Sequence, residues 1–276
     1  MKTTIIKQQL KSEIHKHQKS NVKRVSRHFF LFAAFIFSLL SMTSYAQTTA
    51  PVKNVVLVHG AFADGSGWKG LYKILTQKGY HVTIVQNPLT SLEDDVAATN
   101  AVLDKQDGPT ILVGHSWGGA VITQAGNHPK VAALVYVAAF QPDNGESVLT
   151  WVQKAPPAPE NGILAPDAKG IVYYDQAKYH AGFCADISKA DADFMYASQG
   201  AFHAKGFVTP LTQAAWHEKP SYGIVATEDK SINPDIQRTM YKRSGAKITE
   251  IKGSHVVFIS QPELVVKVIV AASKKE

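Results

Sequence analysis

The chain has 276 residues and a formal net charge of +7, which is enough length to bury one full core or two smaller ones. The charge is uneven, because residues 1–46 hold eight basic and one acidic side chain, whereas residues 47–276 hold 21 of each. A neutral body argues against a nucleic-acid-binding protein, which needs its basic excess on the folded domain. The single cysteine, Cys184, excludes an internal disulfide, and we interpret it as a buried small side chain.

Residues 1–46 have the order of an export signal. A basic segment ends at Arg27, an apolar run of twelve residues interrupted only by Ser38 follows over 29–40, and small side chains precede Gln47. This order predicts a signal peptide cleaved after Ala46, and therefore a periplasmic or secreted protein. A run of twelve residues is shorter than the roughly 20 that cross a bilayer, so no membrane span is expected after cleavage. An uncleaved anchor is the alternative.

From residue 54 onward, short apolar strands alternate with helical segments. Such alternation indicates an α/β fold with a mostly parallel sheet and helices on both faces. Ser66 and Ser91 are expected to cap the first two helices. Asn54 follows Gln47 by only seven positions, which leaves no room for extra leading strands and predicts about six strands in all. The expected strands cover 54–60, 81–86, 111–113, 131–140, 222–229 and 247–252, and the expected helices cover 68–77, 91–102, 120–125, 234–244 and 262–272.

The alternation stops over residues 141–218. This stretch contains a proline cluster at 154–159 and many aromatic side chains, and the strand pattern resumes at Tyr222. We predict a lid of about 141–218 inserted between two strands of one domain, residues 47–276, and not a second domain.

Residues 114–118 read Gly-His-Ser-Trp-Gly and fit the G-x-S-x-G nucleophile elbow. An apolar strand precedes them and a helix follows, as the motif requires. A strand that turns sharply into a helix leaves room only for glycine on either side of the turn and strains the central residue. The turn would hold the Ser116 hydroxyl at a helix N-terminus, where free N–H groups stabilise an anion.

A serine nucleophile needs a base, which is usually a neutral imidazole. Of the eight histidines in the body, only His255 lies in a loop just after the last predicted strand, at the edge where Ser116 should emerge. His59 lies at the same edge, but its place before Gly60 fits a structural or oxyanion-loop role. His115 flanks the serine and should point into the protein. We predict His255 as the base.

The base needs a carboxylate to fix its tautomer. Asp229 closes the strand before His255 and gives the chain order Ser, Asp, His. Asp143 follows the strand after the elbow and is the alternative. Glu228 would alternate to the other face of its strand.

A tetrahedral intermediate needs two N–H donors. The Trp117 amide follows the nucleophile directly, and the Ala61 amide belongs to the loop after the first strand. The alternative for His59-Gly60-Ala61 is a tight turn with no catalytic part.

Four motifs together resemble those of the α/β-hydrolases: Val-Val-Leu-Val-His-Gly-Ala at 55–61, Gly-His-Ser-Trp-Gly-Gly at 114–119, Ala-Thr-Glu-Asp-Lys at 226–230 and Gly-Ser-His at 253–255. More narrowly, they are similar to the small cofactor-free branch of methylesterases and hydroxynitrile lyases. The resemblance covers about 54–272 and is weakest in 141–218. It implies Ser116, Asp229 and His255 as the triad and Ala61 and Trp117 as oxyanion donors.

Two departures from the lyases favour hydrolysis. The lyases carry a lysine beside the catalytic histidine, where this chain has Val256, and they replace the glycine that is Gly60 here. We therefore expect an exported serine esterase that needs no cofactor or metal and cleaves a small carboxylic ester or lactone. A ligand-binding homologue with little or no turnover and a cofactor-free perhydrolase are the alternatives.

Aromatic side chains in and near the predicted lid suggest an apolar pocket. Phe62, Trp151, Phe202 and Trp216 are candidate substrate-binding residues. The alternative is that they pack the lid onto the sheet. The sequence does not predict the oligomeric state.

Overall fold

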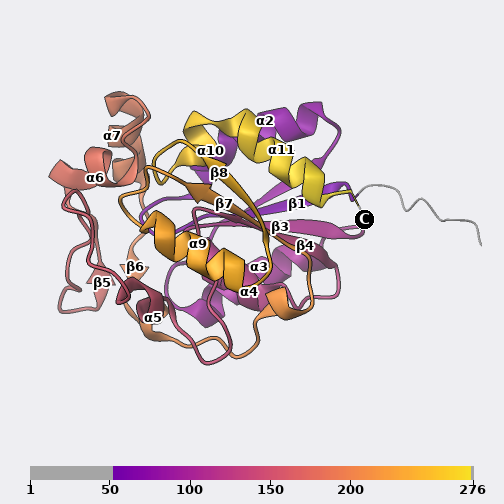
Figure 1. Ribbon diagram of the computed structural model, residues 1–276, viewed down its shortest axis with the longest axis horizontal. Helices are drawn as coiled ribbons and strands as arrows, with labels where there is room; N and C mark the ends of the chain where they lie inside the picture. Colours follow the sequence, from indigo (N-terminus) through magenta and orange to yellow (C-terminus); the bar gives the residue numbers. More distant parts are fainter. Residues whose placement is uncertain (1–51, 275–276) are drawn as a thin grey trace, which may run out of the picture. The chain divides into compact units, whose positions relative to one another are not determined.

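The computed structural model describes residues 52–274, so the predicted signal peptide and its cleavage site lie outside the described residues. Strands and helices alternate through most of this range (Figure 1). The strands are β1 (Asn54–Val58), β2 (His81–Val85), β3 (Thr110–His115), β4 (Val131–Val137), β5 (Ile171–Val172), β6 (Phe202–His203), β7 (Ser221–Ala226) and β8 (Lys247–Ile251). The helices are η1 (Gly65–Trp68), α2 (Lys69–Gln77), α3 (Leu92–Asp104), α4 (Gly118–Ala125), α5 (Val148–Val152), α6 (Gln176–Phe183), α7 (Lys189–Ser198), α8 (Lys205–Val208), η2 (Ala215–His217), α9 (Pro234–Arg243), α10 (Val257–Ser260) and α11 (Pro262–Ala272).

Six strands form one sheet in the order β2-β1-β3-β4-β7-β8, and every neighbouring pair is parallel. The predicted α/β fold with about six strands is confirmed. The central strands β1, β3 and β7 are buried along their whole length, whereas the edge strands β2 and β8 are partly exposed. Burial on both faces explains why the central strands are continuous apolar runs.

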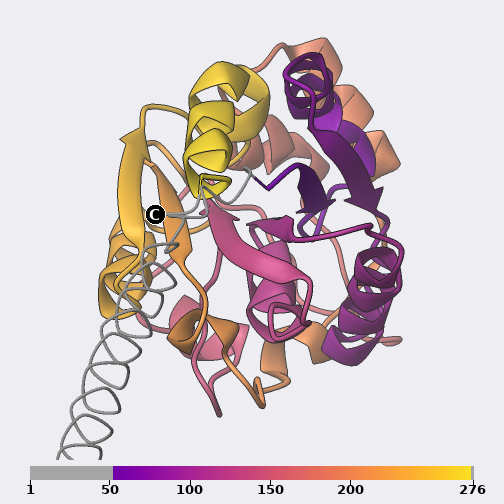
Figure 2. The same ribbon diagram turned by 90° about the vertical axis from the view of Figure 1, so that its right-hand side faces the viewer.

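Helices cover both faces of this sheet. Helices α2 and α11 pack together on one face, and α3, α4 and α9 pack on the other (Figure 2). Because all six strands run the same way, their carboxyl ends meet at one edge, and the loops that follow them converge there.

Helix caps and strand ends differ in places from the prediction. Ser91 caps α3 as predicted, since its side chain accepts the Asp94 amide hydrogen. The cap assigned to Ser66 is wrong, because Asp64 caps η1 and accepts the Ser66 amide hydrogen. Strand β4 stops at Val137, three residues earlier than expected, because Ala138 takes φ +44°, which no strand accommodates.

The segment 141–218 leaves the sheet after β4 and returns before β7, which are neighbours in the sheet. It contains α5 to α8, η2 and the small antiparallel pair β5-β6. In Figure 1 most of it lies at the left, where the arrowheads of β7 and β8 point. Its two ends are tied together, because Asn144 bridges Leu211 and the Asn144 side chain accepts the Ala214 amide hydrogen at 2.6 Å. We call residues 141–218 the inserted segment.

Candidate active site

Ser116 lies in the turn between β3 and α4 with φ +54°, the left-handed backbone that a nucleophile elbow requires. The turn is crowded. A Cβ on Gly118 would lie 2.6 Å from the Val58 carbonyl oxygen of the neighbouring strand. Glycine at this position therefore lets α4 start directly against β1, and the elbow predicted from residues 114–118 is present.

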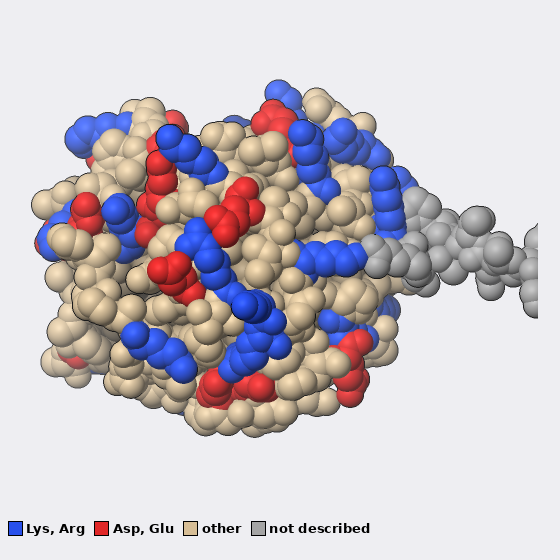
Figure 3. Space-filling model, viewed as in Figure 1, with Lys and Arg blue, Asp and Glu red and all other residues tan. Residues whose placement is uncertain are grey.

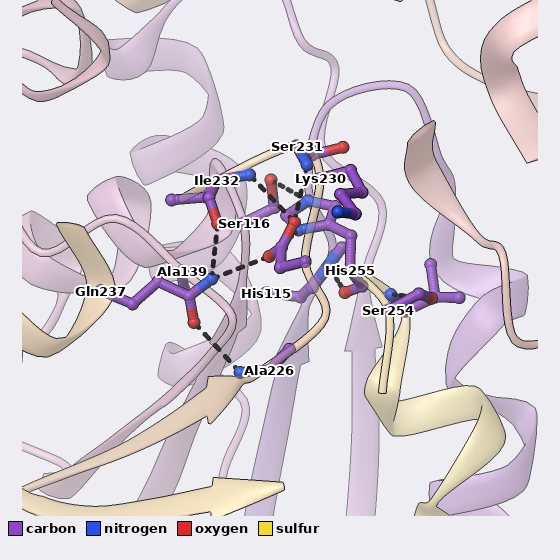
Figure 4. Close-up of polar contacts among 12 residues, drawn as sticks. His115, Ser116, Ala139, Ala226, Lys230, Ser231, Ile232, Gln237, Ser254 and His255 are labelled. Carbon is purple, nitrogen blue, oxygen red and sulfur yellow. Dashed lines mark hydrogen bonds and ion pairs between the residues drawn. The ribbon is translucent and has the colours of Figure 1, made fainter. Parts of the chain in front are cut away.

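Three side chains from three strand-end loops form a continuous hydrogen-bond chain (Figure 4). His255, after β8, has Nε2 at 2.8 Å from Ser116 Oγ and Nδ1 at 2.7 Å from Asp229 Oδ2. Asp229 follows β7, and both His255 and Asp229 are almost fully buried. The carboxylate accepts the Nδ1 hydrogen, which leaves Nε2 free to accept the serine proton.

The other candidate acids lie elsewhere. Asp143 pairs with His217 at 2.7 Å on the inserted segment, and its carboxylate is partly exposed. Glu228 lies on the surface, 3.5 Å from Lys252. Of the three candidates weighed from the sequence, Asp229 is the one hydrogen-bonded to His255.

Asp229 is held by three further donors. Its Oδ1 accepts the amide hydrogens of Ser231 and Ile232 at 2.7 and 2.9 Å, and its Oδ2 also accepts from Gln237 Nε2 at 2.8 Å. Gln237 is a fully buried residue of α9, and its side-chain oxygen accepts the Ala226 amide hydrogen. Four donors on one carboxylate fix its orientation.

Sequence reasoning missed Gln237. A glutamine on a helix gives no sign of what it contacts, and only the folded packing of α9 on β7 aims it at the acid. In the sequence, Gln237 is marked only as a polar residue between Ile236 and Met240, two apolar residues of the same helix.

The loop that carries His255 is held from two sides. His115 Nε2–H donates to the His255 carbonyl oxygen at 2.9 Å, and burial followed by the nearby His255 ring holds the pKa of His115 well below its usual range. On the other side, Asp186 of the inserted segment accepts hydrogen bonds from the Ser254 amide at 2.7 Å and from the Ser254 hydroxyl. His115 is buried, as expected, and its lowered pKa keeps the ring neutral. Asp186 is a second contact that sequence reasoning missed.

The two predicted oxyanion donors line the same cavity as Ser116. Within residues 52–274, neither the Ala61 nor the Trp117 backbone amide donates to a protein acceptor. Both amides therefore remain available for a ligand oxygen. The Ala61 amide lies in the loop after β1, and the Trp117 amide lies at the N-terminus of α4.

His59 stabilises the loop that presents Ala61. Its Nδ1–H donates to the Gly60 carbonyl oxygen, and its Nε2 accepts the Asn87 amide hydrogen, both at 2.9 Å. These roles require the neutral ring, in agreement with the pKa of His59, which burial lowers. The structural role expected for His59 fits these contacts.

A cavity of about 460 Å³ opens beside Ser116 and His255. Its polar lining outside the triad is Asn161, Lys230, Ser231 and Asn233. Most of the wall is apolar and comes from the oxyanion loop, the loop after β4, the inserted segment, the loop after β7 and the start of α9: Phe62, Phe140, Leu149, Val152, Ile163, Phe183, Phe207, Ile232, Ile236 and residues 155–158.

Of the four aromatic residues predicted to bind substrate, only Phe62 lines this cavity. The Trp151 indole donates to Glu146 and stacks under Arg243, and the Trp216 indole donates to the Pro142 carbonyl oxygen. Phe202 packs against the Trp117 ring and is fully buried. Assigning these three to the pocket is therefore wrong. Trp151 and Trp216 both pack against Arg243 of α9, and Phe202 packs against Trp117, so the three join the inserted segment to the rest of the domain.

In residues 52–274, no group of three His, Cys, Asp or Glu side chains is placed to hold a metal ion. No helix in the same range has both the length and the apolar character that a membrane crossing requires.

The chain is similar to several known hydrolases. It is 29% identical over 250 residues to the pyrethroid hydrolase of Sphingobium wenxiniae, covering 79% of this chain and 86% of that protein. It is 31% identical over 118 residues to the carbendazim hydrolyzing esterase of a Nocardioides species, covering 38% of this chain and 49% of that protein. The crystal structure of polyneuridine aldehyde esterase, 21% identical, superimposes with a TM-score of 0.70 and covers 80% of this chain and 99% of that one.

The family model described as the alpha/beta hydrolase family matches residues 55–268. This range runs from β1 to α11 and includes the elbow, the acid and the histidine. The chain belongs to the alpha/beta hydrolase family.

Proposed function

We propose that this protein hydrolyses carboxylic esters through an acyl-enzyme on Ser116. The observation that carries the proposal is the hydrogen-bond chain from Ser116 through His255 to Asp229, in a cavity that two unpaired backbone amides also line. The names of the relatives, a pyrethroid hydrolase and a carbendazim hydrolyzing esterase, support the same reaction class.

The geometry gives each group a part in the reaction. His255 Nε2 takes the Ser116 hydroxyl proton as Oγ attacks the ester carbonyl carbon, and the charge on the carbonyl oxygen is stabilised by the Ala61 and Trp117 amides. The protonated His255 then gives its proton to the departing alcohol oxygen, which leaves the acyl group on Ser116. Water, deprotonated by His255, attacks the acyl carbon and releases the acid. Asp229 remains ionised throughout and stabilises the imidazolium.

The cavity favours an ester with a substantial apolar arm. Its volume of about 460 Å³ falls in the range of small-molecule sites, and its wall is mostly aliphatic and aromatic. On the face in Figure 3, basic and acidic side chains are interspersed, so nothing there resembles a surface for a polyanion. A lactone of similar size would fit the same chemistry.

We further propose that the protein is exported, that its signal peptide ends at Ala46, and that the inserted segment acts as a lid. The basic and then apolar leader supports export. Residues 155–158 and Ile163, which all belong to the inserted segment and line the cavity, support the lid.

A fluorophosphonate probe tests the proposed function. We expect stoichiometric labelling of the peptide that contains Ser116, with loss of hydrolysis across a panel of esters that vary in acyl and alcohol size. Mass spectrometry locates the label, and initial rates on the panel measure the loss.

The same experiment separates the alternatives. Labelling at Ser116 without turnover of any ester would indicate a binding protein. Halogenation that depends on peroxide and acetate would indicate a perhydrolase. Labelling at another residue with hydrolysis intact would overturn the proposal.

Gly60→Ala tests the oxyanion loop. A Cβ at this position would lie 2.7 Å from Ser116 Cβ and 3.1 Å from the His115 carbonyl oxygen, so the loop or the elbow must shift. We expect kcat/KM for an ester to fall on the order of 100-fold, as for an ångström-scale misplacement of catalytic groups.

The matched control is Gly70→Ala on α2, where the new Cβ meets only Pro262 at 3.7 Å. It should keep full activity and raise Tm slightly, because alanine favours a helix over glycine. Equal activity of the two variants would contradict the assigned role of the loop.

A further inference from the structure

Asp95 is a buried carboxylate that the triad does not use. It lies in the first turn of α3, and its side chain is fully buried. Its Oδ1 accepts the Leu89 amide hydrogen at 2.8 Å, and its Oδ2 accepts the Trp117 indole hydrogen at 2.7 Å. Among the described residues no lysine or arginine pairs with it. Within residues 52–274, the Asp95 carboxylate therefore has only two N–H groups as hydrogen-bond partners.

Holding a carboxylate in this place is costly. An ionised group taken out of water without a counter-charge is strongly disfavoured. Burial accordingly raises the pKa of Asp95 to about 6, although the bonds from Trp117 and Leu89 act in the opposite direction. The bonds to Trp117 and Leu89 each fix one part of the structure near Ser116.

The first bond fixes Trp117, the residue that follows Ser116. The Trp117 ring packs edge-on against Phe202, with the ring centroids 5.2 Å apart, and the Asp95 bond fixes its indole nitrogen. Ser116 has a strained backbone, which persists only where the surroundings determine it on every side. A fixed Trp117 side chain holds the peptide whose N–H is the proposed oxyanion donor.

The second bond fixes the loop after β2. Leu89 has φ +61°, and its carbonyl oxygen accepts the His203 amide hydrogen from the inserted segment. Two residues earlier, Asn87 binds His59 through its amide and its side chain, and His59 precedes the loop of Ala61. One carboxylate thus supports the elements that carry both oxyanion donors.

We propose that ionised Asp95 is a positioning residue that holds the oxyanion hole in its working geometry through Trp117 and Leu89. The inference rests on the proposed ester hydrolysis at Ser116.

The charges around Asp95 are few. Asp94, next to it on α3, raises its pKa further. Glu93 on the same turn contacts Lys205 of α8 at 3.5 Å. From the inserted segment, His203 lies beyond Leu89 and donates only its backbone amide to it. The elbow presents the neutral Trp117.

Protonation has opposite effects on activity and stability. The native pKa of about 6 lies above the value near 4 of an unfolded aspartate. Between these values the native state binds the extra proton, so its stability gains from this group as the pH falls through 6. The indole loses its charged acceptor in the same interval. Activity should therefore fall while the contribution of Asp95 to stability rises.

The kinetic test is Asp95→Asn, which leaves one of the two N–H donors facing an amide N–H. We expect kcat for an ester to fall roughly ten-fold, the effect of one unsatisfied buried donor, with KM changed less than about two-fold. Asp94→Asn, the same change at an exposed neighbour, should keep the parent kcat. In a Trp117→Phe background, which has no indole donor, Asp95→Asn should have little further effect. An equal fold-loss in both backgrounds would show that Asp95 does not act through the Trp117 indole and would overturn the proposal.

A spectroscopic test needs no turnover. The ¹H–¹⁵N cross-peak of the Trp117 indole, assigned by its absence in Trp117→Phe, should shift with pH with a midpoint near 6, and the shift should be absent in Asp95→Asn. An identical titration in Asp95→Asn would assign it to a nearby histidine and overturn the proposal. If the protein hydrolysed no ester, the proposed function would fail, while this titration would still report on the Asp95–Trp117 bond.

Discussion

Ser116→Ala is expected to lower kcat for ester hydrolysis on the order of 10⁶-fold while leaving the fold intact. The hydroxyl is the atom that His255 Nε2 approaches at 2.8 Å, and no other hydroxyl contacts that nitrogen in residues 52–274. Steady-state kinetics on the preferred ester of the panel measures the loss. Circular dichroism and Tm should match the parent protein, because alanine accepts the same backbone as well as serine does. Residual hydrolysis at the parent rate would place the nucleophile elsewhere.

Asp229→Asn is expected to lower kcat about 10⁴-fold. An asparagine can turn an N–H group toward His255 Nδ1, which stabilises the tautomer with its hydrogen on Nε2, and that nitrogen then cannot accept the Ser116 proton. The Ser231 and Ile232 amides would still donate to the remaining side-chain oxygen and hold the asparagine in place, whereas Gln237 would lose its acceptor, because it donates to the same oxygen as His255 does. The loss should appear in kcat, with little change in KM.

Asp143→Asn is the matched control, because it makes the same substitution at the other aspartate that was a candidate for the acid. The Asp143 carboxylate contacts His217, and the bond to His217 helps to lower its pKa below the usual range. Its loss should therefore leave kcat within about two-fold of the parent, as for a partly exposed pair. A larger loss in Asp143→Asn than in Asp229→Asn would reverse the assignment of the acid.

The sheet and the triad can be predicted from the sequence for a physical reason. Buried parallel strands must be apolar throughout, so strands such as 110–115 and 221–226 stand out, and parallel pairing brings all their carboxyl ends to one edge. Ser116, Asp229 and His255 each follow such a strand. Their proximity follows from topology without any knowledge of side-chain packing.

The pocket wall and the contacts that support the triad cannot be predicted in this way. The sequence of the inserted segment does not indicate which aromatic residues face the cavity, so the prediction includes Trp151 and Trp216, which do not line it, and omits Phe183 and Phe207, which do. In an irregular segment, the direction of each side chain depends on long-range packing, and the sequence has no periodicity that would reveal it. Gln237 was missed for a related reason, because its partner Asp229 lies on another element.

The joined ends of the inserted segment have a consequence for how a protein of this kind acquires a new substrate. Asn144 and Leu211 already lie side by side, so a replacement for the chain between them adds almost no loop-closure entropy, and even a doubling in length costs only about 0.6 kcal/mol. The inserted segment can be replaced as a unit, while the loops at the ends of the sheet strands keep Ser116, Asp229 and His255. The contacts between the segment and the rest of the domain limit the exchange. A new segment must, for example, supply an acceptor for Ser254, as Asp186 does.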